Sequence, residues 1–386
     1  MDAKQAAAQA FEAVEGDLRQ ISRWLYENPE VAYEEHESSH RLVEFMTANG
    51  FEVEYPAYGL ATSFAARAGS DGPEVIICAE YDALPEVGHA CGHNIIATAA
   101  CGAGVALRDA ADQLGFRVTV LGTPAEEAYG GKVDLIEAGA FSGAAAAMMV
   151  HPSVRDEVDP GVLAVAHVDV EFHGKESHAA FAPEKGINAL DAAVQAYVNV
   201  STLRQTLLAT DRVHGVITYG GGAPNVVPPF TSMAWYVRSA TRSRLDELYP
   251  RVLSCFEAAA IATGCKHEVH QRGHLYTDMV SDSLLADLYA ANSEAMGRPM
   301  HRRGSDPPLG GSTDMGNVSH EVPTIHPMLD IQSLPAVNHQ REFAAHTITP
   351  AGERAIRDGA LGMAYTVIDV AGPGRWDELG SPVAVG

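Results

Sequence analysis

The spacing of apolar residues along the chain predicts two kinds of structure. In the first part, runs of consecutive apolar residues at 75–79, 117–121 and 146–150 alternate with segments of helical periodicity. Buried strands that alternate with helices are typical of an α/β layer whose sheet is covered on both faces. The expected elements are helices at 3–28, 37–49, 94–112 and 130–138, and two further short strands at 51–55 and 61–67.

The periodicity changes near residue 162. From Val165 onward apolar and polar residues alternate, which predicts a half-exposed strand. The elements expected after it are a helix at 187–208, strands at 213–219 and 231–237, a helix at 241–263 and a strand at 266–271. This β-α-β-β-α-β order is that of a small, ferredoxin-like α+β domain with its helices on one face. Because the first pattern resumes after residue 277, we expect a discontinuous α/β domain, 1–164 and 277–386, interrupted by an inserted domain at 165–276.

Composition narrows the class of protein. With 386 residues, 46% of them apolar and 20% charged, the chain can form two globular domains. Its formal net charge of −24 argues against nucleic acid or an anionic membrane as partners, since both require a basic surface. No apolar run approaches about 18 residues, so no transmembrane helix is expected. Five cysteines with spacing unlike a disulfide framework favour the reducing cytoplasm.

Side chains able to bind a metal ion follow three of the predicted strands and recur near the end of the chain. They are Asp82, Cys91 and His93 after the 75–79 strand, Glu126 and Glu127 after the 117–121 strand, His151 directly after the 146–150 strand, and His346. In open α/β sheets, functional sites form beyond the carboxyl ends of the strands. We therefore expect these groups to converge at one edge of the sheet.

This combination of side chains is suited to a centre with two metal ions. The Cys91 thiolate can bridge two ions, and imidazoles and carboxylates can complete both coordination shells while leaving room for water. Because Glu126 and Glu127 point different ways on an extended or turning segment, one can bind metal while the other acts as a general base. Thiolate and imidazole favour Zn, although Mn, Co or Ni bind similar mixed sites.

Each of these residues also has a structural interpretation. Adjacent glutamates are usually a solvated surface, and the HACGHN segment could hold a buried cysteine and a capping histidine. His151 could bond a loop, and Asp82 could cap a turn instead of orienting a ligand imidazole. Their joint occurrence at three strand ends, in sheet order, favours the metal site.

The inserted domain offers candidates for substrate contacts. His178 could donate to an oxyanion or lie on the surface, and Asn225 could bind a carbonyl or hold its glycine-rich turn. Arg238 could clamp a substrate carboxylate or be solvated, and His214 is a weaker candidate. Outside this domain, His326 could face a pocket or be structural.

Several motifs in a fixed order give the chain a family resemblance. They are DALP, HACGHN, PAEE, a strand-end His-Pro, SHAA, GGxxPNVVP, GGSTDMGN and a late Ala-His-Thr, spread over about residues 10–370. Together they resemble the co-catalytic metallopeptidases of the aminoacylase and carboxypeptidase-G type. The Cys-Gly-His pair is similar to the hippurate hydrolase and auxin-conjugate hydrolase branch. The VPTIHP and STDMGNVS segments look closest to the p-aminobenzoyl-glutamate hydrolase and Xaa-Arg dipeptidase group.

The resemblance implies a mixed-sheet α/β metallopeptidase domain with an inserted α+β lid, through which such enzymes form homodimers. It implies that Glu126 is the general base, that Asp82 orients a ligand, and that His178, Asn225 and Arg238 contact substrate. The metal ligands that it implies are Cys91, His93, Glu127, His151 and His346. Glu80 stands where many relatives carry a metal-binding histidine.

The predicted function is a two-metal amidohydrolase that releases a free amino acid from a dipeptide or an N-acyl amino acid. Its substrate is then a small molecule, and two divalent ions are required per subunit. A second possibility within this class is hydrolysis of aromatic or xenobiotic amides, such as p-aminobenzoyl-glutamate-like or auxin-conjugate-like compounds. A possibility of another class is a metal-binding homologue without catalytic activity.

Overall fold

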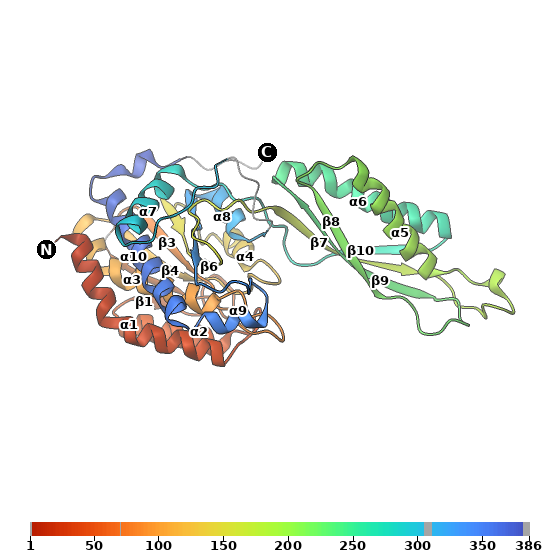
Figure 1. Cartoon of the computed structure of the whole chain (residues 1–386), viewed down its shortest axis with the longest axis horizontal. Helices are drawn as coiled ribbons and strands as arrows, with labels where there is room; N and C mark the ends of the chain where they lie inside the picture. Colours follow the sequence, from red (N-terminus) through yellow and green to blue (C-terminus); the bar gives the residue numbers. More distant parts are fainter. Residues whose placement is uncertain (1, 70, 305–310, 381–386) are drawn as a thin grey trace. The chain divides into compact units, whose positions relative to one another are not determined.

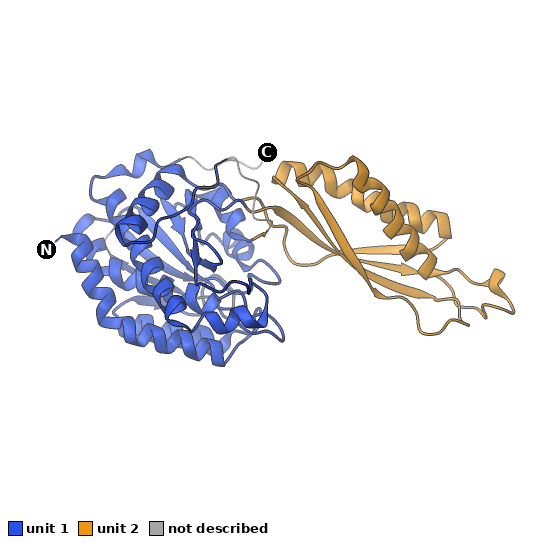
Figure 2. Cartoon of the chain, in the orientation of Figure 1, with its two compact units in different colours: residues 1–161, 279–309, 313–384 blue, residues 162–278, 310–312, 385–386 orange. Residues whose placement is uncertain are grey.

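The computed structural model describes residues 2–69, 71–304 and 311–380, which form two compact units (Figure 1, Figure 2). Val162–Asp278 and residues 311 and 312 form the second unit, and the other described residues form the first. The inserted domain was expected at 165–276, inside that continuous segment. Gly310, the first residue of the GGSTDMGN motif, lies outside the described residues.

The first unit is built on a six-stranded mixed sheet of order β1-β2-β4-β3-β5-β11 (Figure 1). Its strands are β1 (Glu52–Glu54), β2 (Ala65–Gly69), β3 (Glu74–Ala79), β4 (Arg117–Gly122), β5 (Ala146–Met148) and β11 (Thr324–Ile325). β3 runs parallel to β4 and β5, whereas β2 pairs with β4 in the antiparallel direction. The central strands therefore end at one edge, as predicted.

β2 and β5 are both shorter than predicted. β2 begins only at Ala65, because residues 57–63 form a loop closed by the bond from Ala57 N–H to Ser63 O. β5 ends at Met148, and His151 instead begins β6 (His151–Ser153). β6 pairs in parallel with β12 (Met328–Asp330). The histidine that follows the third strand is thus fixed by a second, two-stranded sheet.

Helices cover both faces of the large sheet, as the pattern of buried strands predicts. One face carries α3 (His93–Leu114), which packs against α1 (Ala3–Glu27) and α10 (Pro350–Ala371). Glycines allow this close packing, since a Cβ on Gly104 would lie 2.4 Å from a methyl of Val120 in β4. The other face packs against α4 (Gly131–Glu137) and α8 (Met315–Glu321). The remaining helices of the unit are α2 (His36–Ala48), α7 (Ser283–Ala295), α9 (Arg341–His346) and the 3₁₀ turn η3 (Arg375–Glu378).

The second unit has a four-stranded antiparallel sheet of order β10-β7-β9-β8. The strands are β7 (Ala164–His173), β8 (Arg212–Tyr219), β9 (Phe230–Ser239) and β10 (Lys266–Gln271). Alternate residues of β7 and β9 are buried against α5 (Ala189–Leu203) and α6 (Arg242–Thr263), which explains the period-2 pattern in the sequence. Two 3₁₀ turns, η1 (Pro183–Lys185) and η2 (Arg204–Thr206), flank α5.

The predicted fold class, a mixed-sheet α/β unit combined with a smaller α+β unit, is confirmed. Among the described residues, no helix has both the length and the apolar character needed to cross a membrane.

Candidate metal centre

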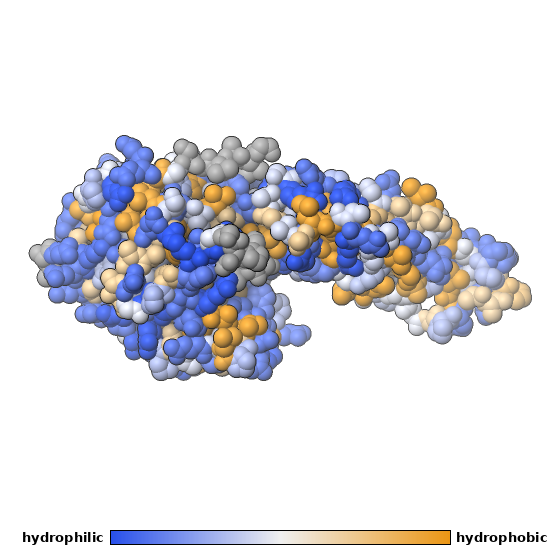
Figure 3. All heavy atoms as spheres, turned by 45° about the horizontal axis from the view of Figure 1, so that its top comes forward, coloured by the Kyte–Doolittle hydropathy of each residue, from blue (hydrophilic) through white to orange (hydrophobic). Residues whose placement is uncertain are grey.

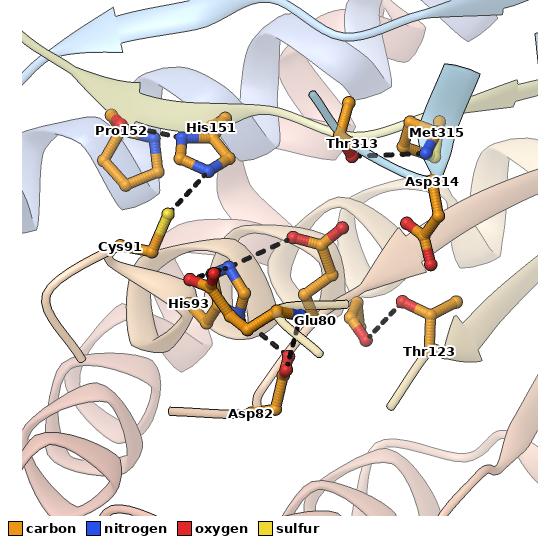
Figure 4. A network of polar contacts seen from close by, with 12 residues as sticks. Glu80, Asp82, Cys91, His93, Thr123, His151, Pro152, Thr313, Asp314 and Met315 are labelled. Atoms are coloured by element: carbon orange, nitrogen blue, oxygen red, sulfur yellow. Dashed lines mark hydrogen bonds and ion pairs between the residues drawn. The ribbon is translucent and has the colours of Figure 1, made fainter. Parts of the chain in front are cut away.

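The loop after β3 brings a thiol and an imidazole to the carboxyl edge of the large sheet. Cys91 and His93 are separated by Gly92, whose φ of 84° lies in the left-handed region. A Cβ on Gly92 would lie 2.3 Å from the ring of Pro152, so only glycine fits between this loop and β6. The turn therefore sets Cys91 beside His151, the first residue of β6, with Cys91 Sγ 3.4 Å from His151 Nε2 (Figure 4).

Three overlapping groups of ligand atoms meet at this point. Within each group the atoms lie no more than 4.8 Å apart. The groups are Cys91 with His93 and His151, Cys91 with Glu127 and His339, and His93 with Glu126 and Glu127. Cys91, His93 and Glu127 each belong to two of these groups, and of the three side chains Cys91 offers a thiolate sulfur that can bridge two ions.

Asp82 fixes the orientation of His93. Its Oδ1 lies 2.9 Å from His93 Nδ1, and its Oδ2 accepts the backbone N–H of Glu127 at 2.9 Å. Burial raises the pKa of Asp82, but the neighbouring His93 outweighs this and lowers that pKa below its usual range. An ionised Asp82 holds the proton on Nδ1 and leaves Nε2 of His93 as a lone-pair donor.

Several buried polar atoms in and beside these groups have no hydrogen-bond partner among the described residues. They include His93 Nε2, Glu80 Oε2 and Glu127 Oε1. His93 Nε2 lies 3.5 Å from Glu80 Oε2 and 3.7 Å from Glu127 Oε1 (Figure 4 draws the first contact). Buried polar atoms without a partner are unfavourable, and a divalent cation would satisfy them. The residues present therefore fit a metal ion.

Glu126 is held beside this cluster by an unusual turn. The preceding Ala125 has a φ of 61°, and its N–H donates to Glu35 Oε1 at 2.9 Å. Glu126 is 8% exposed, and burial together with the charges of Glu80 and Glu127 raises its pKa well above the usual range. A carboxylate with a raised pKa is a stronger base and is suited to accept and return a proton.

The structure presents His339, and not His346, to the cluster. The backbone N–H of His339 donates to Ala90 O at 2.8 Å, which places its Nε2 3.5 Å from Cys91 Sγ and 3.7 Å from Glu127 Oε2. His346 is the last residue of α9 and belongs to none of the ligand groups found among the described residues. The expected late ligand is therefore corrected to His339, an exposed histidine in the loop after an apolar strand, which is the same setting as the other candidates.

Paired substitutions test this correction. We expect His339→Ala to lose a large part of the bound metal, since a ligand is removed, and His346→Ala to keep it. The measurement is metal content per chain by elemental analysis after extensive dialysis. Equal metal content in the two variants would argue against His339 as the ligand.

His326 also lies beside the cluster. Its ring centroid is 5.5 Å from that of His151, its side chain is buried, and neither ring nitrogen has a hydrogen-bond partner among the described residues. Burial, reinforced by the neighbouring His151, lowers the pKa of His326 well below its usual range, so the ring is neutral.

The other candidates for substrate contacts lie in the second unit. His178 is exposed, and its Nδ1 accepts the backbone N–H of Phe181 at 3.2 Å, while Asn225 O accepts the N–H of Ala179 at 3.0 Å. Arg238 donates to Ser312 Oγ at 2.7 Å. His214 lines a cavity of about 380 Å³ on the helix-free face of the sheet together with Gly215, Val216, Ala234, Tyr236 and Arg272.

Glu35 contacts the turn that carries Glu126 and makes the folding stability depend on pH. Its oxygens accept Ala125 N–H at 2.9 Å and Thr62 Oγ1 at 3.0 Å. Burial, followed by the charge of Asp82, raises the pKa of Glu35 to about 7. Because this pKa is higher in the folded protein than in the unfolded chain, folding is favoured at low pH and loses this advantage as the pH rises through about 7.

We therefore expect Glu35→Gln, which mimics the protonated acid, to become more stable relative to the wild type as the pH rises. The gain at alkaline pH is at most about 3 kcal/mol. The measurement is the melting temperature of both metal-free proteins at pH about 5.5 and about 8.5. A difference between the two proteins that is the same at both pH values would show that Glu35 does not titrate in this range.

Comparisons with known proteins show which proteins the chain resembles as a whole. A model of peptidase family M20/M25/M40 matches residues 76–343. Xaa-Arg dipeptidase of Mus musculus is 39% identical over 95% of this chain and 88% of its own length. One of the subunits of p-aminobenzoyl-glutamate hydrolase of Escherichia coli is 30% identical over 65% of this chain and 57% of its own. A Bacillus subtilis dinuclear metal-binding peptidase of the M20 family superimposes with a TM-score of 0.66 at 21% identity, over 93% of this chain and 99% of its own.

Proposed function

The chain belongs to peptidase family M20/M25/M40, and we propose that it releases a free amino acid from a dipeptide or an N-acyl amino acid. It is a hydrolase of peptide or amide bonds. The observation that carries the specific proposal is the meeting of two ligand groups at Cys91, one with His93 and His151 and one with Glu127 and His339. Glu126 lies next to these groups in the sequence and in space.

We assign one divalent ion to Cys91, His93 and His151 and a second to Cys91, Glu127 and His339. When bound, such ions polarise a carbonyl and make water nucleophilic near neutral pH. The donor set fits Zn, and Mn, Co or Ni are alternatives. The partly exposed Glu127 and the exposed His339 leave one side of the cluster open to solvent, which a small-molecule substrate requires.

Glu126 is assigned as the general base. Its carboxylate takes a proton from the attacking water and later gives it to the nitrogen of the leaving amine. Glu127 cannot share this role, because its carboxylate faces His93 and His339. Asp82 holds His93 in place during the reaction through its bond to Nδ1.

Substrate recognition is assigned mostly to the second unit. Arg238 is suited to a free carboxylate, while His178 and Asn225 are suited to the reacting carbonyl. His214 and Arg272 lie on the same face of the sheet as Arg238, where they add positive charge or hydrogen-bond donors. His326 is assigned to the substrate side of the metal cluster because its neutral ring has nitrogens free to donate or accept.

Dipeptides are favoured over aromatic amide conjugates as substrates. The similarity to Xaa-Arg dipeptidase extends over 95% of the chain, whereas that to the p-aminobenzoyl-glutamate hydrolase covers 65%. We also propose the reducing cytoplasm as the location, supported by five cysteines that are all unpaired in the structure.

A panel assay tests the proposed function. The metal-loaded protein is incubated with dipeptides that end in basic, acidic and apolar residues, with N-acyl amino acids and with p-aminobenzoyl-glutamate, and free amino acid is measured. We expect release from dipeptides with Zn, Mn, Co or Ni, and none after chelation. Release from aromatic conjugates alone would favour the second substrate class. Bound metal without turnover of any compound would support a non-catalytic homologue.

We further propose a homodimer that forms through the second unit. β8 is an edge strand, and it exposes Val216, Ile217 and Tyr219. The middle of α5 exposes Tyr197 and Val198. Figure 3 shows apolar residues spread over the visible face of this unit. An apolar edge strand with unpaired backbone groups is a natural site for pairing with a second copy.

Lysine on this edge should prevent dimer formation. We expect Ile217→Lys to be monomeric under conditions in which the wild type is dimeric, because a buried charge opposes strand pairing. Ile261→Lys, at an exposed apolar position of α6, is the matched control and should remain dimeric. The measurement is molar mass by light scattering during gel filtration. A dimeric Ile217→Lys variant would place the interface elsewhere.

A further inference from the structure

A second buried cluster lies directly behind the metal ligands. Carboxylate oxygens of Glu80, Glu126 and Asp314 lie within 4.8 Å of one another, and all three residues are buried. Figure 4 shows the side chain of Glu80 beside His93, with that of Asp314 on the other side of the Glu80 carboxylate in this view. Three carboxylates so close together, away from water, require a positive charge among them.

Lys132 supplies that charge from the chain itself. Its side chain is fully buried, and its Nζ donates to Glu80 Oε1 and to Asp314 Oδ1, the latter at 2.7 Å. Its backbone N–H also donates to Asp314 Oδ2 at 2.9 Å. Burial alone lowers the pKa of Lys132, but the charges of Asp314 and Glu80 outweigh this and raise it above the usual range, so the ammonium form persists.

The local fold is shaped to deliver this lysine. Gly130 has a φ of 77°, and a Cβ on Gly131 would lie 2.0 Å from Pro124 O. The chain therefore turns back tightly against Pro124, on the other side of the Glu126–Glu127 pair, before α4 begins. This turn brings Gly131 against Pro124, and the Lys132 contacts tie the same segment to Glu80, just after β3, and to Asp314, just before α8.

We propose that Lys132 is a positioning residue, an internal cation that holds the Glu126-bearing turn against Glu80 and Asp314. The inference rests on Glu126 being the general base of the proposed function. Lys132 does not touch the cluster of metal ligands directly; Glu80 links the two, since its other oxygen faces His93 Nε2 at 3.5 Å. The lysine thus keeps Glu126 in a fixed position relative to the metal ligands whether or not metal is bound.

The test is Lys132→Ala with chemical rescue. The substitution removes the equivalent of one propylammonium ion, so propylammonium should fit the vacated space, and 1-propanol serves as its neutral isostere. We expect kcat to fall about 100-fold, as a displacement of about 1 Å can cause, while KM and metal content change little. Propylammonium, and not 1-propanol, should raise both kcat and the melting temperature of the variant.

Lys4→Ala is the matched control, because Lys4 also pairs with a carboxylate, Asp369 at 2.7 Å, but on the surface between α1 and α10. We expect it to retain the wild-type kcat and to show no response to propylammonium. Wild-type kcat in Lys132→Ala, or equal rescue by 1-propanol and propylammonium, would overturn the proposal.

A charge-neutral triple variant covers the case in which Lys132→Ala does not fold. The variant Glu80→Gln/Lys132→Met/Asp314→Asn replaces the lysine together with the two carboxylates that it contacts. Neither of those positions then carries a buried charge without its partner. We expect it to fold and bind metal but to keep a low kcat, and recovery of wild-type kcat would overturn the positioning role. The melting-temperature response of Lys132→Ala to propylammonium needs no turnover, so it tests the internal cation even if Glu126 is not the base.

Discussion

Replacing Glu126 by glutamine should lower kcat by about 10²–10⁴-fold while both metal ions remain bound. The amide has nearly the same shape as the carboxyl group but cannot accept the proton of the attacking water. KM should change less than kcat, since the loss is confined to the step in which the proton moves. The measurements are steady-state kinetics on a hydrolysed dipeptide and metal content per chain.

The neighbouring glutamate is the matched control. Glu127 faces His93 and His339 with its two oxygens, so Glu127→Gln should lose metal and activity together. The two variants therefore separate a base from a ligand at adjacent positions. Wild-type kcat in Glu126→Gln would show that another group takes the proton, and metal loss from Glu126→Gln would make Glu126 a ligand.

Replacing Cys91 by alanine should have the second large effect, on metal binding. Cys91 is shared by both ligand groups, so its loss weakens both positions at once. We expect metal affinity to fall by more than the about 10–100-fold that follows loss of a residue that only orients a ligand. The measurement is competition for metal with a chromophoric chelator, followed by the residual hydrolysis rate.

Cys101→Ala is the control for this substitution. Cys101 is another buried thiol, on α3, and it belongs to none of the ligand groups found among the described residues. It should lose some packing energy and keep its metal. If Cys91→Ala binds metal as tightly as Cys101→Ala does, the thiolate does not bridge the ions.

The sequence predicted the positions of most candidate ligands because they follow strands. Cys91, Glu127 and His151 each lie in the segment that follows a buried apolar run, and parallel strands bring such segments to one edge. The late histidine was placed wrongly because the sequence offers two histidines in this part of the chain, and His346 was chosen for its Ala-His-Thr motif. A single backbone bond, from His339 to Ala90, selects it over His346.

The second cluster could not be found from sequence spacing. Lys132 is 52 residues from Glu80 and 182 from Asp314 in the sequence. Taken singly, each is a charged residue of a type that usually lies on the surface. Only the fold shows that all three are buried together. Glu35 is a similar case, since its bond to Ala125 joins residues 90 apart in the chain.

The order and type of the helices and strands were more predictable than the residues at which they end. Period-2 burial on β7 and β9 comes directly from side chains that alternate between the helix-covered face and the open face. The helix expected at 187–208 ends at Leu203, and a 3₁₀ turn follows, because Arg204 turns its guanidinium back to Val213 O in β8. Such tertiary bonds leave no periodic signal in the sequence.

The central claim is that two metal ions and Glu126 together hydrolyse an amide bond. Titration of metal-stripped protein with Zn or Mn, with release of free amino acid measured at each step, tests it most directly. The rate on a cleavable dipeptide should rise until two ions are bound per chain and stay near zero in Glu126→Gln at the same loading. A rate that is full at one ion per chain, or that persists without metal, would contradict the account.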